Sequence, residues 1–104
     1  MRFLIKANIP VEEGNQAIIN GTLPKTMEKA IADLKPEAVY FGLENSQRTA
    51  YFFVNMNENS DMVKLVEPFF FAFNADVDCI PVMTPEDLHK GGASFEGIIK
   101  KYKS

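Results

Sequence analysis

Few residues of this chain have side chains that commonly carry out chemistry. There is one histidine, His89, one cysteine, Cys79, and three tyrosines beside the ordinary charged groups. One cysteine and one histidine cannot supply the ligands of a Cys/His zinc site. The sequence also has no glycine-rich phosphate loop and no nucleophile elbow. It therefore predicts no metal site and no bound cofactor, and it identifies no catalytic residue.

Lys6 and Asp78 are the first pair that could form a site. Each belongs to a segment, residues 2–9 and 75–83, in which apolar and polar residues alternate as they do in a strand. Neighbouring strands would bring the two side chains together on one sheet face. In a dry cavity the pair could bind an anionic ligand or transfer a proton, whereas in solvent it would be an ordinary ion pair of little energetic value.

Tyr40 and Tyr51 form the second candidate pair. Residues 38–44 and 47–56 are rich in aromatic and β-branched side chains and flank Asn45-Ser46, which predicts a hairpin with a two-residue turn. The register then places Tyr40 opposite Tyr51. Two phenols could orient a flat aromatic ligand, but a cross-strand aromatic pair can equally serve only to stabilise the hairpin. With two asparagines of the same face, the predicted ligand-binding set is Lys6, Asn8, Tyr40, Tyr51, Asn55 and Asp78.

His89 and Cys79 fit structural roles better than chemical ones. His89 falls in the last turn of a predicted helix, just before Gly91-Gly92, where the negative end of the helix favours a protonated imidazole. This placement argues against a general base or a haem ligand. Cys79 falls on the apolar side of its strand, where we expect it to pack as a small hydrophobic residue.

The predicted elements follow the order β-α-β-β-α-β and end in a helical tail. Split β-α-β units with right-handed crossovers give an antiparallel sheet of strand order 4-1-3-2 with both main helices on one face. Residues 1–104 are expected to form one domain, with a core over 1–83 and a helical C-terminal extension over 84–104. The local signals are a helix break at Gly21, caps at Ser60 and Thr84, a stop at Gly91-Gly92, and a last apolar stripe of Phe95, Ile98, Ile99 and Tyr102.

The strand alternation sorts the sheet into two unlike faces. The apolar face should lie under the helices, and its members are Phe3, Ile5, Ala7, Val39, Phe41, Phe52, Val54, Val77 and Cys79. The opposite face mixes polar groups with five large residues, namely Leu4, Tyr40, Phe53, Ile80 and Val82. A patch of this kind usually marks a contact. We expect it to be covered either by the C-terminal segment of the same chain or by a second copy.

Composition excludes some classes of partner. The chain is 46% hydrophobic and 24% charged, with a net charge of −3, so it lacks the basic surface of a nucleic-acid-binding protein. Its apolar segments are too short to span a bilayer, so no membrane partner is expected. We therefore expect a soluble cytoplasmic protein.

The element order, a length near one hundred residues, the Asn45-Ser46 hairpin and the mixed second face resemble the dimeric α+β barrel superfamily of ferredoxin-like folds. The resemblance covers residues 1–83 and is closest to small uncharacterised bacterial and archaeal domains of that superfamily. It implies a homodimer in which two sheets face each other around a cavity, and members include cofactor-free monooxygenases and isomerases. The expected function is thus a homodimeric small-molecule-binding domain, with oxygenase- or isomerase-like activity left open. The alternative is a non-catalytic oligomerising or regulatory module with no ligand site.

Overall fold

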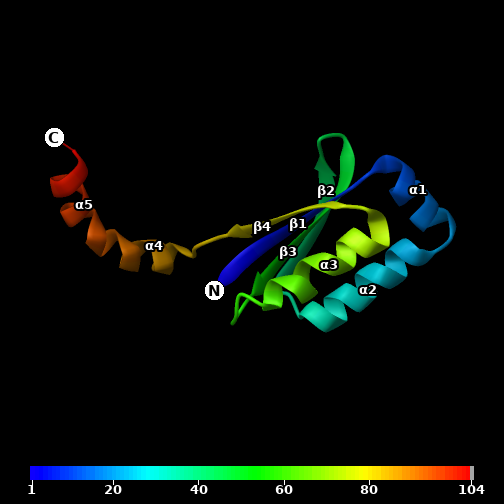
Figure 1. Ribbon diagram of the computed structural model, residues 1–104, viewed down its shortest axis with the longest axis horizontal. Coiled ribbons are helices and arrows are strands. Elements are labelled where there is room, and N and C mark those ends of the chain that lie inside the picture. The colour runs from blue at the N-terminus through cyan, green and yellow to red at the C-terminus, as the bar shows by residue number, and fades with distance from the viewer. Residues whose placement is uncertain (104) are drawn as a thin grey trace.

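A computed structural model describes residues 1–103 and shows an α+β fold (Figure 1). Strands and helices follow one another as the sequence predicts, with the first helical region divided in two. The elements are β1 (Arg2–Ile9), α1 (Val11–Ile19), α2 (Thr22–Leu34), β2 (Ala38–Glu44), β3 (Gln47–Asn55), α3 (Asp61–Phe73), β4 (Asp76–Pro81), α4 (Pro85–Gly91), the 3-10 turn η1 (Gly92–Ser94) and α5 (Phe95–Tyr102).

The four strands form one antiparallel sheet in the order β2-β3-β1-β4, which is the predicted order read from the other edge. The hairpin register is also confirmed, because Tyr40 lies opposite Tyr51. Asn45 and Ser46 both have positive φ angles, 53° and 61°, as a type I′ turn requires. Lys6 of β1 lies opposite Tyr51 on one side and Asp78 on the other.

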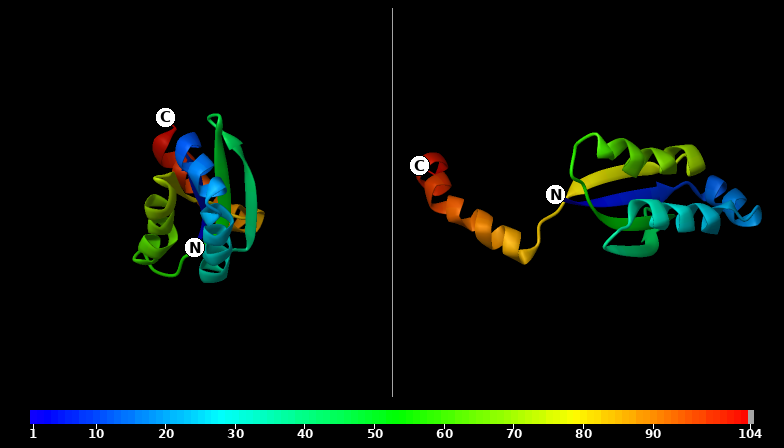
Figure 2. Two further views of the ribbon diagram at one scale, coloured as in Figure 1. Left: turned by 90° about the vertical axis from the view of Figure 1, so that its right-hand side faces the viewer. Right: turned by 90° about the horizontal axis from the view of Figure 1, so that it is seen from below.

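Helices α1, α2 and α3 cover one face of the sheet (Figure 2). In β1 every second residue is buried beneath them, which is the pattern of a strand with one face on the core. Phe52 of β3 and Phe69 of α3 are completely buried, and their ring centroids lie 5.3 Å apart. Gly21, at φ 77°, separates α1 from α2, so the predicted break is confirmed; a left-handed residue of this kind suits glycine.

Two local predictions are wrong. Phe41 is predicted to lie beneath the helices, but it is 61% exposed, because it lies on the edge strand β2 outside the core that the helices form with the sheet. Ser60 does not cap α3 with its side chain. Instead the Asp61 carboxylate accepts hydrogen bonds from the backbone N–H groups of Asn57 and Glu58.

Residues 84–103 form a C-terminal arm that projects from the sheet and the three helices (Figure 1). The predicted cap at Thr84 is present. The predicted stop is also present, since α4 ends at Gly91. Gly91 and Gly92 nevertheless keep right-handed φ angles of −66° and −60°, so the chain continues through η1 into α5 without a sharp reversal. The molecule is consequently 58 Å long but only 27 Å and 22 Å in its other dimensions. The C-terminal arm leaves the second sheet face uncovered.

Candidate functional site

The candidate site is the sheet surface opposite the helix layer, which we call the open face. Register places its side chains in rows that cross all four strands. One row is largely apolar and consists of Ala38, Phe53, Leu4 and Ile80. The next row is polar and consists of Tyr40, Tyr51, Lys6 and Asp78. Four of the six predicted site residues therefore share one row.

A hydrogen-bonded network lies at the centre of the open face. The Lys6 ammonium donates to Glu44 Oε2 at 2.5 Å, and the Tyr51 hydroxyl donates to Glu44 Oε1 at 3.1 Å. The Lys6 side chain is only 20% exposed. Lys6 and Asp78 are neighbours in register, as expected, but among the described residues the ion-pair partner of Lys6 within 4.0 Å is Glu44. Glu44 is not among the residues that the sequence predicts for the site.

The network holds each of its three groups in its ordinary protonation state. The hydrogen bond to Glu44 raises the pKa of Lys6 above its usual 10.5, and the hydrogen bond from Lys6 lowers the pKa of Glu44 below 4.5. Burial, followed by the hydrogen bond to Glu44, raises the pKa of Tyr51 above 10.0. At neutral pH the arrangement is thus an ammonium, a carboxylate and a neutral phenol. None of the three is poised to exchange a proton near pH 7.

Asn8 stabilises the hairpin next to this network. Its amide nitrogen donates to the backbone oxygen of Glu44 at 2.9 Å and to Thr49 Oγ1 at 2.8 Å. Both amide hydrogens are therefore engaged within the protein, and Thr49 is only 2% exposed. The contact ties β1 to the end of the β2–β3 hairpin and fixes the position of Glu44.

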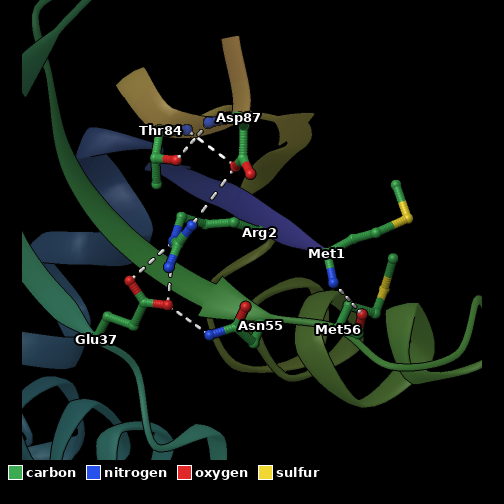
Figure 3. Close-up of polar contacts among 7 residues, drawn as sticks. All are labelled: Met1, Arg2, Glu37, Asn55, Met56, Thr84 and Asp87. Atoms are coloured by element: carbon green, nitrogen blue, oxygen red, sulfur yellow. Dashed lines mark hydrogen bonds and ion pairs between the residues drawn. The ribbon is translucent and has the colours of Figure 1, made fainter. Parts of the chain in front are cut away.

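Asn55 lies apart from the other predicted site residues. It is opposite Arg2 at the far end of β3 and donates to the Glu37 carboxylate, which also accepts from Arg2 Nε at 2.9 Å (Figure 3). Arg2 in turn reaches Asp87 of α4 at 3.9 Å. Asn55 thus belongs to a cluster that joins the strand ends to the start of the C-terminal arm, and not to the Lys6 network.

Tyr40 gives the open face an accessible aromatic ring. It is 61% exposed and packs edge-on against Phe53, with ring centroids 6.4 Å apart and planes at 83°. The contact connects the polar row with the apolar row. A ligand lying on this face would therefore meet aromatic surface on one side and the Lys6–Glu44–Tyr51 network on the other.

His89 and Cys79 lie outside this arrangement. His89 is exposed in the last turn of α4, as predicted from its position before the glycines. Cys79 is partly buried against the core, and this burial raises the pKa of its thiol. Within residues 1–103, no three His, Cys, Asp or Glu side chains come close enough together to hold a metal ion.

Comparisons of the chain with protein-family models, with curated proteins and with solved structures gave no match. Within residues 1–103 no helix combines the length and the hydropathy needed to cross a membrane.

Proposed function

We propose that this chain is a small-molecule-binding domain that acts as a homodimer, with the open faces of two copies packed against each other in the manner of a dimeric α+β barrel of ferredoxin-like type. The observation that carries the proposal is the Lys6–Glu44–Tyr51 network at the centre of a face that also bears an uncovered row of large apolar side chains. Such a combination suits a ligand pocket, which is mostly apolar with a few fixed polar groups.

Exposure of the open face supports association through it. Tyr40 is 61% and Ile80 37% exposed in the single chain, and Leu4 and Phe53 are partly exposed beside them. Contiguous apolar surface of this kind is unfavourable in water and usually marks an interaction site. A second copy brings an identical face, so a two-fold contact covers both at once.

The side chains suggest which ligands would fit between two such faces. Tyr40 and Phe53 offer aromatic surface, while the Lys6 ammonium has hydrogen-bond donors beyond the one that Glu44 accepts. A flat, largely apolar molecule with an anionic or carbonyl oxygen matches this set. Because the pKa shifts of Lys6, Glu44 and Tyr51 all move away from neutrality, the site is better suited to binding than to proton transfer.

Titration with 1-anilinonaphthalene-8-sulfonate, an aromatic anion that fluoresces in apolar sites, tests this function. We expect saturable binding to the wild type and binding at least about tenfold weaker to Lys6→Met, since a charge-assisted contact contributes more than about 1.4 kcal/mol. Lys25→Met, an exposed lysine of α2, is the matched control and should bind as the wild type does.

Changes in the backbone amide NMR shifts during the same titration show where on the protein the anion binds. Shifts that cluster at Lys6, Tyr51 and Phe53 support the proposal. Equal affinity of the Lys6→Met and wild-type proteins, or shifts confined to the helix layer, would show that the open face is not the ligand site.

A second function is also supported by a specific observation. The described residues include no fully buried side-chain nitrogen or oxygen without a hydrogen-bond partner, so no fully buried polar group among them requires a ligand. In addition, five of the surface hollows on residues 1–103 have no lining contribution from Lys6, Tyr51 or Asp78. A non-catalytic oligomerising or regulatory module would have these properties. It would form the dimer but would show no saturable binding at the open face.

A further inference from the structure

The C-terminal arm, residues 84–103, presents large apolar side chains that are about half exposed or more. None of the described residues of α4, η1 or α5 is buried. The apolar residues of α5 nevertheless fall on one stripe, as an amphipathic helix that packs on a partner requires. The exposed fractions along the arm are 52% for Leu88, 56% for Phe95, 48% for Ile98, 55% for Ile99 and 80% for Tyr102.

The direction in which the C-terminal arm leaves the sheet is fixed by several contacts. Val82 donates its backbone N–H to the Arg2 carbonyl at 3.1 Å. Thr84 and Asp87 then form a capping box, with hydrogen bonds of 3.0 Å and 3.1 Å. Arg2 lies between Glu37 and Asp87 and links the first turn of α4 to the sheet (Figure 3). These contacts point α4 away from the open face of its own chain, as Figures 1 and 2 show.

Charge is divided between the C-terminal arm and the rest of the chain. Residues 84–104 contain four basic and three acidic side chains, a net charge of +1, whereas residues 1–83 contain seven basic and eleven acidic ones, a net charge of −4. On β4, exposed Asp76 and Asp78 have no cation within 4.0 Å among the described residues. The lysines near the end of α5 therefore have a complementary surface on the β4 border of the open face.

The apolar area of the C-terminal arm is sufficient for a stable contact. At about 150–250 Å² for a fully accessible large side chain, the exposed fractions of the five apolar residues correspond to roughly 500 Å² on one arm. If each arm covers an equal area of its acceptor surface, each contact buries roughly 1,000 Å². The two contacts of a dimer then bury roughly 2,000 Å² in all, which is the size of a specific protein interface.

We infer that the C-terminal arm of each copy packs against a second copy of this chain along the β4 border of its open face. The apolar stripe of α5 then covers Ile80 and its neighbours, and Lys101 lies near Asp76 and Asp78. The inference rests on the proposed homodimer and adds the element that holds the two copies together. A second copy is the occupant because each chain carries both the arm and the acceptor surface, so a two-fold exchange satisfies both without leaving either exposed.

Substitution on the two sides of α5 tests the role of the C-terminal arm. Ile98→Glu with Ile99→Glu places two charges in the apolar stripe, and we expect dissociation to monomers at micromolar concentration in sedimentation velocity. Gly97→Glu adds a charge on the opposite side of the same helix turn, where a new side chain meets open space, and should leave the dimer intact. If the double variant remains dimeric while the wild type is a dimer, the inference about the arm is wrong and the proposed dimer stands. A monomeric wild type contradicts both.

The position of the C-terminal arm is tested with a mixed dimer. One chain carries a spin label at Gly97→Cys, with Cys79→Ser to remove the native thiol, and contains no ¹⁵N. It is mixed with a ¹⁵N-labelled wild-type chain. We expect paramagnetic broadening of the Asp76, Asp78 and Ile80 signals in the ¹⁵N-labelled copy. Broadening confined to α2 and α3 would place the arm on the helix layer and overturn the inference. A second sample has the spin label and ¹⁵N on the same chain. If the signals broaden only in that sample, the arm folds back on its own sheet and the inference is wrong.

Discussion

Replacing each residue of the Phe69-Phe70-Phe71 run in turn by alanine gives a graded prediction about how α3 packs. The three side chains are adjacent in sequence and identical in chemistry, but they are 0%, 38% and 86% exposed. Consecutive residues of a helix point about 100° apart, so only one of the three points directly at the sheet. Phe69 does so, and its ring lies against Phe52.

The magnitudes follow from the buried fractions. A fully buried phenylalanine costs about 3–5 kcal/mol when it is truncated to alanine, and we expect this loss for Phe69→Ala. For Phe70 and Phe71, multiplying the buried part of about 150 Å² of ring surface by about 25 cal/mol per Å² gives roughly 2 kcal/mol and roughly 0.5 kcal/mol. These values are upper limits, since an unfolded chain already buries part of its apolar surface.

Urea unfolding followed by far-ultraviolet circular dichroism measures the series. For a domain of this size about 1 kcal/mol corresponds to about 4–8 °C in Tm, so thermal melts of the three variants should separate clearly. If Phe69→Ala does not fold, Phe69→Leu should still lose about 1 kcal/mol relative to the wild type. A loss at Phe71 equal to that at Phe69 would refute the orientation of α3. So would a fully stable Phe69→Ala protein.

Three further predictions concern the network, the turns and the cap. The pKa of Glu44 is lowered in the folded protein, so its ionised carboxylate stabilises the fold at pH values above the ordinary pKa of 4.5, and this stabilisation is lost as pH falls through the folded-state pKa. The difference in urea stability between the wild type and Glu44→Gln should therefore shrink as pH falls below roughly 5. A difference that stays constant with pH would contradict this prediction. Ser46→Gly should stabilise and Gly21→Ala destabilise the protein, each by about 1 kcal/mol, because both positions have positive φ; unchanged urea midpoints would refute this. Thr84→Ala should remove about 0.5–2 kcal/mol from α4, seen as faster amide exchange at Asp87, and unchanged exchange would show that the cap contributes nothing.

The sheet could be predicted from the sequence because its information is local and repeated. Alternation in β1 and in both strands of the hairpin fixes which residues share a face, and the Asn45-Ser46 turn fixes the register. The strand order then makes Lys6 and Asp78 neighbours on one face, as predicted.

The polar contacts were harder to predict because they depend on side-chain reach and on sheet twist. Register places Glu44 opposite Gln47, so the alternating pattern alone does not indicate a bond between Lys6 and Glu44. Their contact crosses from β1 to the end of β2 diagonally over β3. The alternation predicts Asn55 for the same site because it shares a face with Lys6, but Asn55 lies opposite Arg2, too far along β3 to reach that network.

The direction of the C-terminal arm is the other feature that the sequence does not determine. The Thr84 cap and the apolar stripe of α5 are local signals, and both are present. The direction of α4 is set in part by contacts with Arg2, whose carbonyl accepts from Val82 N–H and whose side chain meets Asp87 from 85 residues earlier in the chain. A contact of that separation has no signature in local pattern or spacing.

Association through the open face is the central claim, and intermolecular nuclear Overhauser effects test it most directly. A dimer sample that mixes ¹³C,¹⁵N-labelled and unlabelled chains would be examined in an isotope-filtered experiment. We predict cross-peaks between copies from the side chains of Leu4, Phe53 and Ile80. Intermolecular cross-peaks confined to helix-layer residues such as Phe71 would contradict the account. So would a protein that stays an 11.7 kDa monomer and gives no intermolecular cross-peaks.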